Sequence, residues 1–215
     1  MLLTFKDAII GIIYVVWVAL VTLKLSKVVA KKTNTYVARK FIHMAGGGVV
    51  AVTSPFLLSS PLVVIVASYL MMGYLLIRRL RQPMSWFQES DNMGEIFFSF
   101  SFGTVLLVMW ILEPTFWELG NKYLYVALLP LIFMSFGDGV TGIVRNYVYG
   151  RRFKGFWGSV GMLILTAPLG YLLLSVPGLL SAVIATAVEV LPILDDNLSV
   201  SFLSFAFLLA AVKLG

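Results

Sequence analysis

The run AIIGIIYVVWVALVTLKLSKV, residues 8–28, is apolar at nearly every position. It is long enough to cross the hydrocarbon core of a bilayer, which takes about 20 residues of helix. Lys6 and Asp7 stand directly before it, and no small-residue cleavage pattern follows it. The run is therefore typical of a first membrane span and not of a cleaved leader.

The composition of the whole chain agrees with this first span. The 215 residues are 60% hydrophobic and only 12% charged, and they include no cysteine. The mean hydropathy is +0.97. A soluble domain is nearer half apolar and a quarter charged, so a soluble globule, a disordered chain and a disulfide-stapled domain are all excluded. We predict an all-α polytopic transmembrane bundle that forms one domain over residues 1–215.

Apolar segments divide the chain into about eight expected spans. They do not alternate at a period of two residues, which argues against a porin-type barrel. The expected spans are 8–28, 41–58, 61–77, 93–112, 123–142, 157–174, 177–191 and 198–215.

The basic residues set the expected orientation. With eight crossings, thirteen of the sixteen Lys and Arg residues fall in or beside the loops on one side. Loops rich in Lys and Arg stay in the cytoplasm, so that side is expected to be cytoplasmic and both termini are expected on the opposite side.

Several polar residues fall at the same expected face. On a helix, Arg39, Lys40 and His43 share one side because they are three and four residues apart. We expect a cationic cluster at a helix N-terminus, which suits phosphate. The alternative is that the two basic residues are ordinary interfacial anchors and that the histidine is structural. The triplet 46–48, all glycine, permits either close helix packing or room for a lipid or phosphate.

Two further motifs indicate phosphate and metal chemistry. Asp138 lies between Gly137 and Gly139 at an expected helix end, where a carboxylate is a natural Mg²⁺ ligand; the alternative is a helix-terminating turn. Lys154 and Ser159 frame the start of the next apolar segment, where a lysine and a helix N-terminus suit an anion. The alternative for this second motif is an ordinary basic loop at the interface.

Near the C-terminus, acidic residues gather again. Glu189 interrupts an apolar segment, and Asp195, Asp196 and Asn197 follow it within nine positions. Together they are suited to bind a metal or a ribose, whereas a solvated loop explains Asp195 and Asp196 but not Glu189.

In this order the motifs resemble the polyprenol kinase family, which includes dolichol kinase, phytol kinase and a fungal-type CTP-dependent diacylglycerol kinase. Its R-K-x-x-H motif matches 39–43, its G-D-G matches 137–139, its K-S-x-x-G-S is similar to 154–159, and its E…D-N-L is similar to 189–198. The resemblance covers roughly residues 36–205, and the run 137–152 resembles archaeal members. Gly155 replaces the first serine of the third motif, and the family's arginine at short spacing after the G-D-G is absent, which leaves open which arginine of 145–152 binds phosphate.

The resemblance implies phosphoryl transfer from CTP or UTP to a membrane isoprenoid alcohol, with Mg²⁺ as cofactor and no nucleic-acid partner. It implies catalytic roles for Asp138, His43 and Lys154, and metal ligation by Asp138, Glu189 and Asp196. The expected phosphate- and nucleotide-binding residues are Arg39, Lys40, Gly137, Gly139, Arg145, Arg152, Ser159 and Asn197. A CDP-lipid synthase is the closest alternative, and a transporter is a weaker one because its polar site would lie near the midplane. The acceptor alcohol and the oligomeric state stay open.

Overall fold

The fold is a bundle of membrane-length helices. The computed structural model describes residues 3–151, 153–191 and 194–215, and the regular secondary structure of these ranges is helical. The expected all-α polytopic bundle is thus confirmed. The α-helices are α1 (Phe5–Leu20), α2 (Ser26–Lys32), α3 (Thr35–Ile42), α4 (Val49–Leu57), α5 (Leu62–Arg81), α6 (Gly94–Leu112), α7 (Lys122–Ile132), α8 (Asp138–Tyr149), α9 (Phe156–Val190) and α10 (Asp196–Leu214). Three π-helical segments join some of them: η1 (Val21–Leu25), η2 (His43–Gly48) and η3 (Phe133–Gly137).

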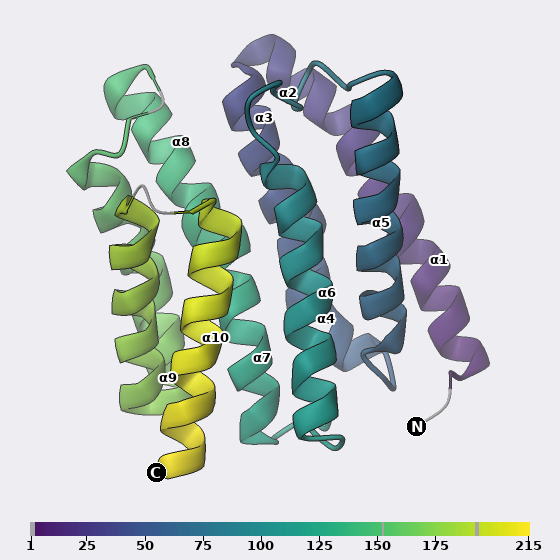
Figure 1. Cartoon of the computed structure of the whole chain (residues 1–215), viewed down its shortest axis with the longest axis vertical. Coiled ribbons are helices and arrows are strands. Elements are labelled where there is room, and N and C mark those ends of the chain that lie inside the picture. Colours follow the sequence, from purple (N-terminus) through teal and green to yellow (C-terminus); the bar gives the residue numbers. More distant parts are fainter. Residues whose placement is uncertain (1–2, 152, 192–193) are drawn as a thin grey trace.

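The helices stand side by side in one bundle (Figure 1). Helices α1 and α5 lie at one edge, α9 and α10 lie at the other, and α6 and α7 stand between them. Helix α7 is the centre of the core, since every residue from 126 to 132 is buried. Both chain ends lie at the same end of the bundle.

The expected number of eight spans is not confirmed. In the described ranges, six helices are long and apolar enough to cross a membrane. One of them, α9, reverses direction within its length: Ser175 has a φ of +50°, and the backbones of Gly170 and Gly178 touch. A straight helix would place residues 170 and 178 about 12 Å apart. The two halves of α9 therefore pack against each other as a hairpin.

A second correction concerns the expected span 123–142. Helix α7, segment η3 and helix α8 follow one another without a break, so the helix runs from Lys122 to Tyr149. The Gly-Asp-Gly motif therefore lies in the middle of a long helix and not at a helix end. The chain leaves the helix at Gly150, whose φ of +63° is the left-handed conformation typical of a glycine after a helix.

The end of the bundle that carries both chain ends is tied together by a buried carboxylate. Asp7 accepts hydrogen bonds from the backbone N–H and the hydroxyl of Ser59, both below 3.0 Å. It also completes a capping box with Thr4 at the start of α1. These contacts join α1 to the turn between α4 and α5.

A loop of residues 82–93 covers part of the opposite end. The guanidinium of Arg79 donates to the backbone carbonyls of Glu89, Ser90 and Asn92, which holds this loop against α5. The indole N–H of Trp86 donates to the carbonyl of Thr22 on η1. The loop thus bridges α5 and the first span.

Candidate functional site

The predicted polar residues do converge at one end of the bundle, which we call the polar end. Lys40, on α3, places its ammonium 2.6 Å and 2.5 Å from the two carboxylate oxygens of Asp138, on α8. Both side chains are almost fully buried. The Nδ1 atom of His43 lies 4.0 Å from the nearer oxygen of Asp138, and its ring stacks on Phe98 at 4.1 Å between centroids.

Three carboxylates meet at this end. Asp138, Glu189 and Asp196 each offer an oxygen, and these oxygens all lie within 4.8 Å of one another. Glu189 and Asp138 are buried, and Asp196 is partly buried. The three residues come from α8, from the end of α9 and from the start of α10. The structure thus brings the three carboxylates together, and their expected ligation of a metal stays a prediction.

Two further cations neutralise the group. Arg145 makes a bidentate pair with Glu189, with N–O distances of 2.6 Å and 2.8 Å. Lys154 donates to the carboxylate of Asp196 at 2.8 Å and to the backbone carbonyl of Glu189 at 2.6 Å. With the Lys40 pair, three carboxylates face three cations, and we call these six residues the charge cluster. Its formal charges cancel, which explains how it stays buried.

Two glycines make room for long cationic side chains. A Cβ added at Gly142 would lie 2.7 Å from two carbons of the Lys40 side chain. A Cβ added at Gly158 would overlap the guanidinium of Arg145 and lie 2.7 Å from its Cγ. These glycines let the lysine and the arginine cross a neighbouring helix to reach their carboxylates. Sequence reasoning missed this function, although the short G-D-G-x-x-G spacing of residues 137–142 is visible in the sequence.

The glycines beside Asp138 serve packing. A Cβ at Gly139 would overlap the side chain of Met44, and a Cβ at Gly137 would lie 2.9 Å from Thr166. Their expected contact with phosphate stays a prediction. The close approach of α8 to α3 and α9 is what brings Asp138 to its partners.

Two π-helical turns lie at the Arg-Lys-x-x-His motif of residues 39–43 and at the Gly-Asp-Gly motif of residues 137–139. Segment η2 begins at His43, and segment η3 ends one residue before Asp138. These two segments contact each other. A π-helical turn inserts one extra residue into a helix and often marks a functional site. Here the two turns set the direction of the histidine and aspartate side chains.

Arg39 does not join the charge cluster. Its guanidinium donates to Glu89 of the 82–93 loop at 3.2 Å. The helix that carries it begins at Thr35, which is capped by Asn34. His43 therefore lies two turns inside the helix, and the expected cationic cluster at a helix N-terminus is wrong. The spacing of Arg39, Lys40 and His43 indicates that they share one side of a helix, but it does not indicate where that helix begins.

Three other residues that were expected to bind phosphate or nucleotide are not part of the charge cluster as the structure describes it. Asn197 is buried and donates to the backbone carbonyl of Gly94, so it ties α10 to α6. Helix α9 begins at Phe156, so Ser159 lies one turn inside it and does not cap it. Arg152 lies outside the described residues. Binding of nucleotide or phosphate by these residues stays a prediction.

An apolar cavity of about 770 Å³ reaches the polar end from the other side of the bundle. Its walls come from α1, η1, α3, η2, α4, α5 and α6, and its polar lining includes Arg39, His43 and Glu95. Glu95 is held by Arg79 and Gln88, which both donate to its Oε1 atom at 3.0 Å. The volume is in the range of ordinary small-molecule pockets. His43 thus lies between this cavity and the charge cluster.

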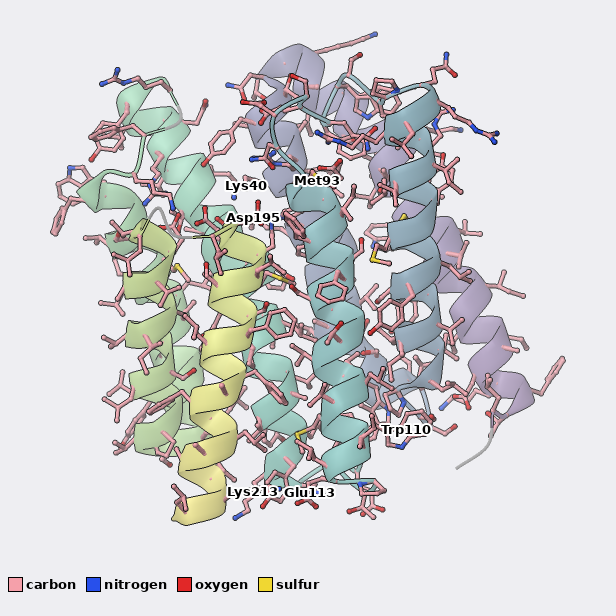
Figure 2. The ribbon with its side chains drawn as sticks, viewed as in Figure 1. Lys40, Met93, Trp110, Glu113, Asp195 and Lys213 are labelled. Atoms are coloured by element: carbon pink, nitrogen blue, oxygen red, sulfur yellow. The ribbon has the colours of Figure 1, made fainter. Side chains whose placement is uncertain are left out.

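Figure 2 shows how far the two ends of the bundle differ. Lys40 and Asp195 lie at the polar end, and Glu113 and Lys213 lie at the other end. The pair of Lys213 and Glu113 is long, at 3.9 Å, and largely solvent-accessible. The ion pairs of Lys40 with Asp138 and of Arg145 with Glu189, at the polar end, are far less exposed than this one.

The donor set of the three carboxylates suits a hard divalent cation. Mg²⁺ binds oxygen ligands at about 2.0–2.1 Å, so two ligands on opposite sides are about 4.2 Å apart. The oxygens of Asp138, Glu189 and Asp196 lie within 4.8 Å of one another, which is close to this separation. The group suits a metal in the chemistry of its oxygens, and binding one requires the three paired cations to turn toward another anion.

Comparisons with protein-family models, with curated proteins and with solved structures find no match for this chain. Its function is therefore argued from its own residues.

Proposed function

We propose that this protein is a membrane lipid kinase that transfers the γ-phosphate of CTP or UTP to the hydroxyl of an isoprenoid alcohol. One observation carries the proposal. A largely buried, self-neutralised cluster of three carboxylates and three cations lies next to a large apolar cavity, with His43 between them. Phosphoryl transfer needs a metal, cations around the phosphates and an oriented nucleophile. The choice of CTP or UTP rests on the motif resemblance.

The carboxylates are proposed to hold Mg²⁺. Asp138 is the first ligand because it is buried at the centre of the cluster, and Glu189 and Asp196 offer the other oxygens. Bound there, Mg²⁺ would neutralise phosphate charge. It is normally held by one or two carboxylates together with substrate phosphates, so not all three carboxylates are needed at once.

The cations are proposed to exchange partners when the nucleotide binds. Lys40, Arg145 and Lys154 each pair with a carboxylate in this structure. A triphosphate offers them stronger, multiply charged oxygens, and a guanidinium suits bidentate phosphate contacts. Freed carboxylates then face the metal. The total charge in the buried site stays near balance throughout this exchange.

The transfer step uses His43 as the acceptor of the alcohol proton. The alcohol oxygen forms a bond to the γ-phosphorus while the bond between that phosphorus and the β–γ bridging oxygen breaks. The hydroxyl proton goes to the imidazole, and the products are a lipid monophosphate and a nucleoside diphosphate. The buried imidazole lies 4.0 Å from Asp138 and borders the apolar cavity, so it is placed to reach both the alcohol and the phosphate.

A product analysis tests the proposal against its closest alternative, a CDP-lipid synthase. Purified protein in mixed micelles receives Mg²⁺, a panel of lipid alcohols and CTP labelled either in the γ-phosphate or in the cytidine. We expect γ-label in the extracted lipid and cytidine label only in CDP. Cytidine label in the lipid would indicate the synthase, and no label in any lipid would end the kinase proposal.

Variants locate the site in the same assay. Asp138→Ala is expected to lower transfer at least about a hundredfold, because it removes the first proposed ligand of the Mg²⁺ that would neutralise the reacting phosphate. Glu113→Gln, at the other end of the bundle, is the matched control and is expected to keep full activity. Equal activities of the two variants would remove Asp138 from the site.

The polar end is proposed to face the cytoplasm. The support is the distribution of Lys and Arg, which sets orientation in most polytopic membrane proteins. The nucleotide is cytoplasmic, so this orientation also gives it access. A reporter fused to the C-terminus is expected on the opposite side, and its appearance in the cytoplasm would contradict this topology.

A further inference from the structure

The apolar cavity opens toward the membrane along its length. Helices α1 and α5 approach closely near one end, where a Cβ at Gly11 would lie 2.9 Å from Val63. Between there and the polar end, lining residues stay uncovered: Ile12 is 66% exposed and Leu70 is 69% exposed. The bundle thus offers a groove between α1 and α5 that hydrocarbon can enter sideways from the bilayer.

Polar atoms without partners lie at the inner end of this groove. Among the described residues, neither ring nitrogen of His43 makes a hydrogen bond, although the side chain is almost fully buried. The Oε2 atom of Glu95 is also buried and unpaired. Buried polar atoms are almost always hydrogen-bonded in native proteins. Three such atoms at the end of one cavity indicate a polar ligand group that belongs there.

The charges around this inner end select the kind of ligand group. The Glu95 carboxylate would repel an anionic head group. The cations beside it, Lys40, Arg39 and Arg79, are already paired with Asp138, Glu89 and Glu95. A hydroxyl fits better, because it can donate one hydrogen bond to a carboxylate or imidazole and accept another from a ring N–H.

We propose that this groove is the binding site of the lipid alcohol, with the hydrocarbon chain between α1 and α5 and the hydroxyl between His43 and Glu95. The inference rests on the proposed function and deepens it, since it identifies where the acceptor binds and from which side it arrives. Glu95 becomes a binding residue for the hydroxyl. The lipid reaches His43 through the membrane, and the nucleotide reaches it through the charge cluster between α8, α9 and α10.

The first experiment maps the bound lipid without any substitution. A polyisoprenoid alcohol that carries a diazirine near its hydroxyl is photolysed with the intact protein in liposomes, and the labelled peptides are identified by mass spectrometry. We expect labels on α1, α5 and α6 around the groove. Unlabelled alcohol should compete at least about tenfold better than its O-methyl ether, which keeps the chain but loses the O–H donor.

The second experiment fills the groove. Ala67→Phe places a ring among the lining residues of α5, and Ala206→Phe, on the exposed face of α10, is the matched control. We expect Ala67→Phe to raise KM for the alcohol at least about tenfold while KM for CTP changes less than about twofold. The control should leave both values unchanged. Glu95→Gln should weaken the preference for the alcohol over its methyl ether.

The outcomes separate this proposal from the kinase proposal. Labels on other helices, together with normal kinetics of Ala67→Phe, would overturn the groove while the kinase activity stands. Equal competition by the alcohol and the ether would show that ordinary bilayer lipid fills the groove and would also overturn it. Competed labelling in the groove without any phosphoryl transfer would support the groove and refute the kinase.

Discussion

The buried pair of Lys40 and Asp138 gives the sharpest prediction about stability. Both side chains are nearly inaccessible, and the ammonium lies 2.5–2.6 Å from the carboxylate oxygens. At an effective dielectric constant of about 20, charges this close attract by ~6 kcal/mol. Much of that attraction only offsets the cost of burying two charges, so the pair adds little over an apolar pair of the same shape. Breaking it by removing one partner typically costs roughly 3–5 kcal/mol.

We expect Lys40→Met to lower the free energy of unfolding by roughly 3–5 kcal/mol. The loss should exceed that of Asp138→Asn. The methionine variant leaves three carboxylates within 4.8 Å of one another with only two cations, whereas the asparagine variant leaves Lys40 close to Glu189 and Asp196. The double variant removes both charges and should recover most of the loss.

The assay is a double-mutant cycle on unfolding in mixed micelles titrated with SDS. The four proteins should give a coupling energy above about 2 kcal/mol between Lys40 and Asp138. Lys213→Met and Glu113→Gln form the control cycle. That pair is 3.9 Å long and exposed by 42% and 29%, so its coupling should stay below about 1 kcal/mol. Additive losses in the first cycle would refute the claim that the two charges depend on each other.

Two other predictions concern the cations of the charge cluster. Gly158→Ala is expected to displace Arg145 and to lower activity at least about tenfold, because the new Cβ overlaps the guanidinium. Gly73→Ala is the control, since a Cβ there meets no atom within 4 Å. It should keep full activity and gain up to about 1 kcal/mol of stability. Lys154→Met is expected to raise KM for CTP at least about tenfold, because contacts to the phosphates are lost. Arg151→Met removes an exposed cation and should change this KM less than about twofold. Equal KM values of the two variants in steady-state kinetics would contradict the proposed function of Lys154.

Much of the fold could be predicted because membrane helices are encoded locally. A span must be apolar over its whole length, so Ala8 to Val28 is recognisable without knowledge of its neighbours. The same local rule places polar residues at the ends of spans. Lys154, Glu189 and Asp196 could therefore be assigned to one end of the bundle before their contacts were known.

The contacts themselves could not be predicted, because packing between distant helices decides them. Arg39 and Lys40 are neighbours in sequence, yet one pairs with Glu89 and the other with Asp138. The π-helical turn that begins at His43 changes which way the following side chains point, and a period of 3.6 residues does not reveal it.

Glu95 shows the same limit. It stands at the start of the expected span 93–112, but nothing in the sequence indicates that Arg79 and Gln88 both bind one of its oxygens and leave the other free. A free, buried oxygen is visible only when every partner has been placed. The proposed hydroxyl site between His43 and Glu95 therefore depends on the structure and does not follow from the pattern of residues.

The pairing of charges within the charge cluster also determines how the binding of metal and the binding of nucleotide depend on each other. Lys40 and Asp138 satisfy each other, so a metal alone would meet both a carboxylate and the repulsion of a nearby ammonium. A nucleotide alone would meet cations but also carboxylates. Metal and nucleotide together present a positive group to the carboxylates and a negative group to the cations. The cluster should therefore favour the metal–nucleotide complex over either component, so nucleotide binding measured by calorimetry should be at least about tenfold weaker without Mg²⁺. Equal affinity with and without the metal would contradict this coupling.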